Sequence, residues 1–231
     1  MPARKHHLTL YEEILLIALD DEKGTTGIES MHKNAMAGAI LAELVLAGAV
    51  AIDDDKKKMV TAKTGAGVTD PILVECLELV QAAKKRKKAA QWVMKFANLK
   101  DLTKRVARQL VAKGILREDQ DKVLGMFRRT IFPERDGGPE RDLIERLRHA
   151  IFTSSTQVDE RTVVIAVLAN ATSLLPRIFA KKKLKERKQR LQNLAEGRVA
   201  AAATKEAIEA MRAAAMVAVI GATVAVSAAS N

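Results

Sequence analysis

The sequence contains few cysteine and aromatic residues. It has one Cys, one Trp, one Tyr and five Phe in 231 residues, although 48% of its residues are hydrophobic. A single cysteine excludes an intrachain disulfide and a cysteine-based metal cluster, which fits a cytoplasmic location. A core with few aromatic side chains must be built from Leu, Ile, Val, Met and Ala, and this composition favours helices over a β-sandwich.

The sequence also lacks the residue patterns of common active sites. Its four histidines are scattered without metal-ligand spacing. The glycine-containing loops at 64–67 and 136–138 lack the glycine spacing and the following Lys-Ser/Thr that bind a nucleotide phosphate. Cys76 lies in an apolar helical run and is expected to be an inert core thiol. We therefore expect no catalytic residue, no metal site and no cofactor.

Two apolar segments bear on membrane association. The N-terminal segment is interrupted by Glu12 and Glu13 and has no small-residue cleavage site, so no secretion signal is expected. Residues 213–229 carry no charge, but seventeen residues are at the short limit of a membrane span. Since alanine and Gly221 add little transfer energy, a buried core helix is favoured over a tail anchor.

Periodicity and capping signals predict a mainly α fold. Thr9 and Glu12 have capping-box spacing, and Asp70-Pro71 is a cap followed by a first-turn proline. Pro176 is expected to kink or end a central apolar helix. The expected helices cover residues 9–19, 30–47, 70–80, 99–113, 140–152, 163–171 and 177–194, followed by an Ala-rich last helix.

Two segments favour β-structure within this helical chain. Residues 49–52 and 59–62 flank a polar turn and predict a small hairpin. Residues 123–132 are apolar and β-prone, and predict a second hairpin or extended arm, which ends before the irregular segment 133–139. The predicted architecture is a single compact helical domain over residues 8–231, with two short β-hairpins, one able to protrude, after a flexible N-terminus at 1–7.

One stretch, residues 84–117, concentrates the positive charge. It contains twelve Lys and Arg residues and one acid, Asp101, so its net charge of +11 equals that of the whole chain. In the helix predicted from Leu99, the apolar positions form one stripe and the cations form the other side. The cations on that side are Lys100, Lys104, Arg105 and Arg108.

This charge density admits three interpretations. A solvated helix face is the simplest, since Lys and Arg are mostly exposed in any protein. Uncompensated cations at this density repel one another, however, and favour an anionic partner, either a lipid headgroup or a nucleic acid. A winged-helix unit formed by residues 30–62 would bind nucleic acid, but that region is acidic and its candidate recognition helix carries Lys33 alone, so nucleic acid is the less favoured partner.

Four colinear motifs resemble the Golgi phosphoprotein 3 family, which also occurs in bacteria. They are LTLYEEILLIALDDEKG from Leu8, AGAILAELVLAGAVAI from Ala37, LVAKGIL from Leu110 and VLGMF from Val123. The resemblance runs from Leu8 to about Val226. It implies a mainly helical peripheral membrane protein of the cytoplasm, on the Golgi face if eukaryotic. Its best-studied members are adaptors that bind phosphatidylinositol 4-phosphate and the cytoplasmic tails of glycosyltransferases.

The resemblance also implies site residues. The headgroup pocket of the family uses a Trp and three Arg, which fall on Ile28, Ala37, Lys100 and Thr103, with Lys104 beside them; only Lys100 keeps its charge. An apolar hairpin beside the pocket enters the bilayer and contributes to self-association. Its counterparts in this chain are Leu124, Met126, Phe127, Arg128 and Arg129, a combination of apolar and cationic side chains that suits a lipid interface. A hairpin packed on its own core or on a second subunit is the alternative.

Overall fold

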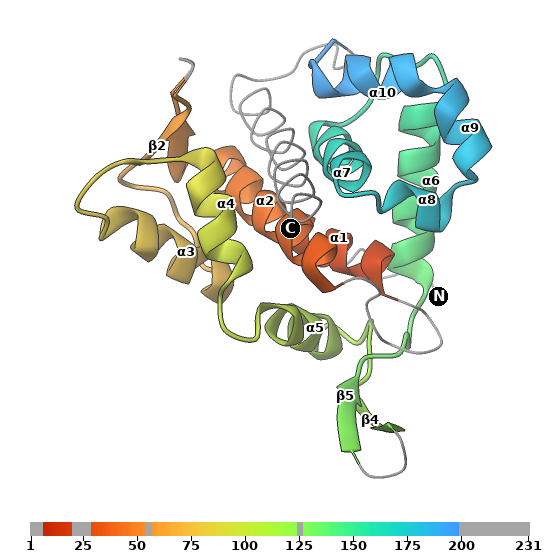
Figure 1. Ribbon diagram of the computed structural model, residues 1–231, viewed down its shortest axis with the longest axis horizontal. Helices are drawn as coiled ribbons and strands as arrows, with labels where there is room; N and C mark the ends of the chain where they lie inside the picture. Colours follow the sequence, from red (N-terminus) through yellow and green to blue (C-terminus); the bar gives the residue numbers. More distant parts are fainter. Residues whose placement is uncertain (1–6, 20–28, 54–56, 124–126, 199–231) are drawn as a thin grey trace, which may run out of the picture.

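The computed structural model describes residues 7–19, 29–53, 57–123 and 127–198 (Figure 1). Over these ranges the predicted fold class is confirmed, because the chain is mainly helical and has two small antiparallel sheets. Residues 1–6 and the Ala-rich segment 213–229 lie outside the described ranges. None of the helices described is long and apolar enough to cross a membrane.

The described helices are, in chain order, α1 (Leu10–Ala18), α2 (Glu29–Leu46), α3 (Pro71–Gln81), α4 (Ala89–Ala97), α5 (Leu102–Ala112), α6 (Gly138–Phe152), α7 (Glu160–Ala171), α8 (Leu175–Ile178), α9 (Lys181–Glu186) and α10 (Lys188–Ala195). The strands are β1 (Val50–Ile52), β2 (Met59–Ala62), β3 (Lys87–Lys88), β4 (Asp119–Val123) and β5 (Phe127–Ile131).

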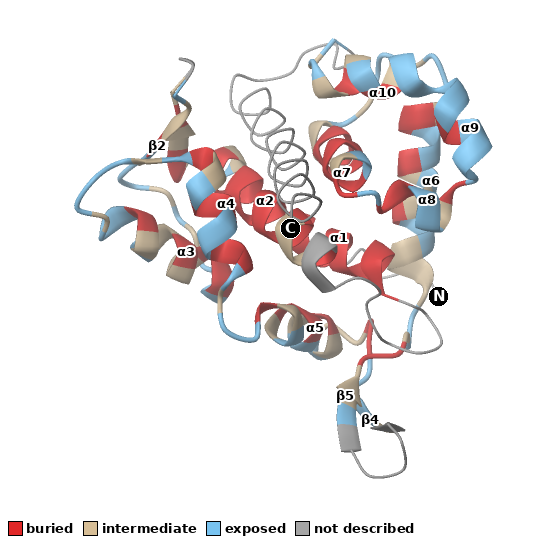
Figure 2. Ribbon diagram, viewed as in Figure 1, coloured by how far each residue is buried: buried red, intermediate tan, exposed pale blue. Residues whose placement is uncertain are grey.

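Helix α1 lies at the centre of the fold. All nine of its residues are buried, and it packs against α2, α5, α6 and α7 (Figure 2). The predicted capping box is present, since the Thr9 hydroxyl accepts from the Glu12 N–H and the Glu12 carboxylate accepts from the Thr9 N–H. The sequence signal at Thr9 therefore sets the start of the central helix.

Helix α2 is almost as enclosed as α1. Its residues from Ala35 to Val45 are all buried. The helix ends at Leu46, one residue before the predicted end, and Ala47 is exposed. Gly48 then adopts φ +66°, a left-handed conformation that is strained for residues with a Cβ, and the chain turns into β1.

The first predicted hairpin is part of a three-stranded sheet. Strands β1 and β2 pair antiparallel with Ala51 opposite Thr61, as expected. The sequence did not predict β3, in which Lys87 pairs with Val60 at the edge of the sheet. Two lysines carry no alternation of apolar and polar residues, so only the tertiary pairing makes them a strand.

The second hairpin projects from the helical body (Figure 1). Strands β4 and β5 pair antiparallel from Asp119 opposite Ile131 to Val123 opposite Phe127. The prediction of a hairpin is confirmed, although it starts four residues earlier than the apolar run. A bridge between Leu116 and Glu134 closes its base.

The C-terminal half of the described chain packs on α7. The expected central helix is confirmed, since residues 162–169 of α7 are all buried. The predicted role of Pro176 was wrong: α7 ends at Ala171, and Pro176 lies in the first turn of the separate helix α8, where a proline is tolerated. The single helix predicted over 177–194 is likewise three helices, broken near Ala180 and at Arg187.

Candidate functional site

The fold divides the basic stretch 84–117 into two groups. Helix α4 separates them, and its nine residues span about 13 Å. One group, Lys84 to Lys88, precedes the N-terminus of α4 and reaches the edge of the sheet. The other group follows α4 and lies on and around α5, next to the projecting hairpin (Figure 1). The stretch is continuous in sequence but does not form one surface.

The first group is partly engaged by the protein itself. Arg86 forms an ion pair with Asp53. The Lys87 ammonium lies 5.4 Å from the ring centroid of Trp92, and Lys95 approaches the same ring at the same distance. Trp92 is fully buried, so the one tryptophan of the chain is not exposed for stacking on a ligand.

Helix α5 has the predicted amphipathic character. Leu102, Val106 and Leu110 are buried on one side. Of the four predicted headgroup-binding residues, Lys100 and Lys104 are exposed, Arg105 is half-buried and Arg108 is exposed. The structure therefore brings all four to the outer side of α5 and the turn before it. We call these four residues the α5 basic face.

Two residues of the α5 basic face have acidic partners. Arg105 forms an ion pair with Glu75 of α3. Arg108 donates to both carboxylate oxygens of Glu118 at 3.1 and 3.2 Å, and this hydrogen bonding lowers the pKa of Glu118. Lys100 and Lys104 form no ion pair with any described residue. These two lysines are the cations of the face that are available to an external anion.

The N-terminus of α5 lies at the same place. Its N-cap residue, Asp101, has φ +53° and makes no side-chain cap hydrogen bond. Exposed N–H groups and the helix dipole make a helix N-terminus favourable for anions. Thr103 Oγ1 lies 3.2 Å from Nε2 of His32, which joins the first turn of α5 to the first turn of α2. The lysine pair thus flanks a helix start that is held against the core.

The described positions that align with the family pocket, Ala37, Lys100 and Thr103, include one cation, Lys100. Ala37 is fully buried inside α2, and Ile28 lies outside the described residues. The Thr103 hydroxyl lies within hydrogen-bond distance of His32, so it is engaged by the protein itself. The exposed cations near the start of α5 are Lys100 and Lys104.

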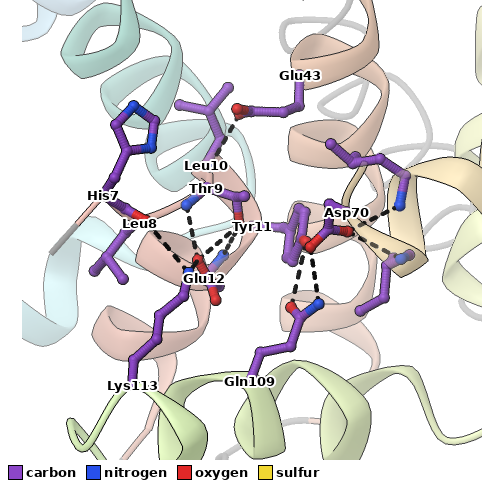
Figure 3. A network of polar contacts seen from close by, with 12 residues as sticks. His7, Leu8, Thr9, Leu10, Tyr11, Glu12, Glu43, Asp70, Gln109 and Lys113 are labelled. Atoms are coloured by element: carbon purple, nitrogen blue, oxygen red, sulfur yellow. Dashed lines mark hydrogen bonds and ion pairs between the residues drawn. The ribbon is translucent and has the colours of Figure 1, made fainter. Parts of the chain in front are cut away.

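The other end of α5 is anchored by a polar network that the sequence analysis missed (Figure 3). Gln109 accepts from the Tyr11 hydroxyl at 3.3 Å and donates to Asp70 at 2.9 Å. Lys113 donates to Glu12 at 2.6 Å. Burial, and secondly Asp70, raise the pKa of Tyr11, so its hydroxyl stays protonated as a donor. The capping signals at Thr9 and Asp70 marked two of these positions, but nothing in the sequence linked them to α5.

Two further buried acids hold α1 and α2 to the C-terminal helices. Glu13 of α1 pairs with Arg146 of α6, and Glu43 of α2 accepts from Arg161 of α7 at 2.9 Å. Burial raises the pKa of Glu13 although Arg146 opposes this shift. Because each acid takes its cation from a different helix, the helices around α1 form a rigid support for α5.

The structure places the hairpin residues only in part. Leu124 and Met126 lie outside the described residues, as do the side chains of Phe127 and Arg128. Arg129 is exposed on β5 and donates to Asp121 of β4 at 3.0 Å. The backbone of the hairpin projects on the same side of the molecule as α5 (Figure 1).

Nothing in the described part of the chain resembles a catalytic centre. No group of three or more His, Cys, Asp or Glu residues there could hold a metal ion. Cys76 is buried, and burial raises the pKa of its thiol to about 12. A groove between α6 and α7 is lined by Arg146, Asp159 and Thr162, but these side chains already bond to one another or to Glu13.

The sequence of this chain matches the model of the family described as Golgi phosphoprotein 3 (GPP34) over residues 10–211. The match includes all the described helices and strands, and with them the α5 basic face and the hairpin.

Proposed function

The chain belongs to the Golgi phosphoprotein 3 (GPP34) family, and on this premise we propose that it is a peripheral membrane adaptor that binds anionic phospholipid headgroups. The headgroup phosphate is bound by Lys100 and Lys104, with Arg105 and Arg108 adding to the local positive potential. The apolar tip of the hairpin enters the same leaflet. No catalytic step and no cofactor belong to this function.

The lysine pair carries this proposal. Lys100 and Lys104 are four residues apart, exposed, and without an ion pair in the described chain. They flank the N-terminus of α5, where the helix dipole adds to their attraction for an anion. Two neighbouring like charges are unfavourable in the isolated protein, and a phosphate between them removes that repulsion.

The direction of the hairpin supports a membrane as the source of the phosphate. A free phosphate would need only the lysine pair, whereas a bilayer also accommodates an apolar tip beside cations. Figure 1 shows the hairpin extending away from the helical body, on the side of α5. One flat membrane can therefore meet the hairpin tip and the α5 basic face together.

The adaptor role itself rests on the family. We propose that the bound protein recognises cytoplasmic tails of membrane proteins on the cytoplasmic side of the membrane, the Golgi face if the protein is eukaryotic. Self-association through the hairpin is a further proposal that follows from the family. The chain from residue 8 onward is proposed to act as one domain in these interactions.

Nucleic-acid binding through a winged helix is less well supported by this fold. That mode requires an exposed recognition helix that enters a groove. Helix α2, the candidate, is buried from Ala35 to Val45 between α1, α4 and α7. The hairpin β1–β2 is present, but the described part of α2 beyond its first turn offers no outward face for a duplex.

Co-sedimentation with vesicles tests the proposed function. We expect binding to vesicles with about 30 to 40% anionic lipid and no binding to neutral vesicles. Binding should weaken as the salt concentration rises, since surface cations near such a membrane contribute about 1 kcal/mol each at low salt. Lys100→Ala/Lys104→Ala should reduce the affinity at low salt about thirtyfold, because two such contributions amount to about 2 kcal/mol. Lys84→Ala/Lys85→Ala removes the same charge at the other end of α4 and should retain most of the binding. Equal loss in both variants, or equal binding to neutral vesicles, would overturn the assignment of the site.

A further inference from the structure

A second cationic surface lies on α9 and α10. Residues 181–190 contain seven basic residues and one acid, Glu186. Six of the seven cations are exposed, whereas Arg190 turns inward and donates to the carbonyl oxygens of Ala150 and Ser155. We call the exposed six the α9–α10 strip: Lys181, Lys182, Lys183, Lys185, Arg187 and Lys188.

The packing of these helices explains why the strip faces outward. Leu184 of α9 and Leu191 and Leu194 of α10 are buried, and α10 packs on α7. The two helices are interrupted at Arg187 alone, so they run as one bent rod whose single apolar edge meets the core. The other sides of α9 and of the first turn of α10 therefore carry the cations, and no apolar residue is exposed among them.

The strip shares with Lys100 and Lys104 the lack of an ion-pairing partner among the described residues. Several exposed arginines elsewhere do form ion pairs, for example Arg108 with Glu118 and Arg129 with Asp121. No side chain of the strip forms an ion pair with a described residue. Six neighbouring cations with this little compensation destabilise the isolated surface, and an external polyanion would relieve the repulsion.

The strip lies on the opposite side of the molecule from the proposed membrane contact. In Figure 1 the hairpin and α5 occupy the lower part of the molecule, and α9 and α10 occupy its upper edge. Helices α6 and α7 lie between them, and Figure 2 shows the outer side of α9 and α10 as exposed. A flat bilayer that meets the hairpin cannot also meet the strip.

We propose that the α9–α10 strip binds a second anionic membrane, so that one molecule bridges two bilayers. This inference rests on the proposed function, which supplies the first membrane contact. The strip suits a membrane surface because five of its six cations are lysines, which attract diffuse headgroup charge without a fixed geometry. It has no exposed aromatic side chain for stacking on unpaired bases, and its neighbouring amide Gln189 already donates to Asn193 at 3.1 Å.

Capture of one vesicle population by another tests the bridging. Anionic vesicles of phosphatidylcholine and phosphatidylglycerol are immobilised, the full chain is added, and retention of fluorescent vesicles of the same composition is measured. Wild type should retain them. Lys182→Glu/Lys185→Glu/Lys188→Glu should reduce retention at least tenfold while its co-sedimentation with vesicles stays within about threefold of wild type. Lys84→Glu/Lys85→Glu/Lys88→Glu makes the same change of charge in the other exposed group and should retain the fluorescent vesicles.

The outcomes separate this inference from the proposed function. If wild type does not sediment with anionic vesicles at all, the proposed function fails. If wild type sediments and the strip variant still captures vesicles, the bridging role is wrong. Loss of sedimentation in the strip variant would make the strip the primary contact and would also overturn the inference. If the strip binds a DNA duplex of about 20 base pairs more tightly than it binds vesicles, the strip would be assigned to nucleic acid and the inference would be wrong.

Sedimentation velocity of wild type and the strip variant checks that both have the same oligomeric state, so that a change in self-association does not mimic bridging.

Discussion

Glu12 is the residue on which two stabilising features of α1 converge. Its carboxylate is fully buried and accepts hydrogen bonds from the Thr9 N–H at 2.8 Å and from the Lys113 ammonium at 2.6 Å. One side chain therefore completes the cap of the central helix and ties the C-terminal end of α5 to it. Replacing it affects both features at once.

We predict that Glu12→Ala lowers the free energy of unfolding by about 2–3 kcal/mol, because it removes a cap contact and leaves the half-buried Thr9 N–H and the Lys113 ammonium without their acceptor. Urea denaturation monitored by circular dichroism measures this change. Glu145→Ala is the matched control, since Glu145 is exposed and pairs with Arg148 one turn away, and it should change stability by less than about 0.5 kcal/mol. Equal effects of the two substitutions would contradict the role given to Glu12.

Glu13 gives the fold a pH dependence of unusual sign for a carboxylate. Burial raises its pKa above 4.5 in the folded protein, although Arg146 and Arg161 oppose the shift, and Asp159 adds to it. The folded state then binds a proton more readily than the unfolded state. The contribution of Glu13 to stability is fully present below pH 4.5 and is lost as the pH rises through the raised pKa.

We therefore predict a pH-dependent difference between wild type and Glu13→Gln. The variant does not titrate at this position, so the stability of wild type relative to the variant should fall as the pH rises above about 4.5. Chemical denaturation of both proteins at several pH values between about 4 and 8 measures the difference in the free energy of unfolding. A constant or rising difference would show that Arg146 dominates over burial.

At the scale of single elements, the β4–β5 hairpin and α5 are the parts proposed to contact a membrane. The β4–β5 hairpin has a ladder of five paired positions and a base closed by the bridge from Leu116 to Glu134. It therefore projects as an ordered ribbon at least as far as Phe127.

We predict that Phe127→Ala weakens binding to anionic vesicles several-fold and leaves the melting temperature nearly unchanged. A phenylalanine that inserts into lipid does not contribute to the core, whereas truncation of a core phenylalanine costs about 3–5 kcal/mol. Phe96→Ala is the comparison, because Phe96 is fully buried in α4 and should give that larger loss. Thermal unfolding and co-sedimentation are measured on both variants, and a large fall in the melting temperature of Phe127→Ala would favour the alternative of a hairpin packed on the core.

Local signals in the sequence predicted these elements well. The cap at Thr9, the proline after Asp70 and the glycine after α2 each act within a few residues, and each is found where it was expected. Strand β3 was missed because Lys87 and Lys88 become a strand only by pairing with β2, far from them in sequence. Pro176 was misread because a proline is equally compatible with ending one helix and with starting the next.

The candidate site was predictable only in part. Periodicity placed Lys100, Lys104, Arg105 and Arg108 on one side of α5, as the structure has them. It could not show that Arg105 and Arg108 have acidic partners, since Glu75 and Glu118 belong to α3 and to the segment after α5. Nor could it show that α4 separates the first five cations of the basic stretch from α5.

At the scale of the whole molecule, the fold distributes one large positive charge into separate surfaces. The net charge is +11, and the sequence places as much in residues 84–117 alone. The structure divides that stretch between the two ends of α4, and adds the α9–α10 strip on the opposite side from the hairpin (Figure 1). We therefore expect the positive charge to favour anionic partners in general, while the geometry of each surface decides what is bound.

The last prediction concerns selectivity among anionic lipids. The lysine pair attracts phosphate but lacks the planar fork with which arginine fixes its orientation, and the positions of the family pocket offer buried Ala37 and the neutral hydroxyl of Thr103. The arginines of the α5 basic face are engaged by Glu75 and Glu118, which limits their contribution to headgroup geometry. We expect a clear preference for anionic over neutral lipid, and less than a tenfold difference in affinity, about 1.4 kcal/mol, among anionic headgroups.

Vesicles matched for total charge measure this selectivity. They contain phosphatidylinositol 4-phosphate, phosphatidylglycerol or cardiolipin, and binding is compared for wild type and Lys100→Ala/Lys104→Ala. A site that attracts negative charge without distinguishing headgroup structures should bind all three compositions with similar affinity. The double substitution should weaken binding to all three by a similar factor. A phosphoinositide preference well above tenfold that the double variant abolishes would mean that Lys100 and Lys104 belong to a stereospecific pocket, and would overturn the expectation of weak selectivity.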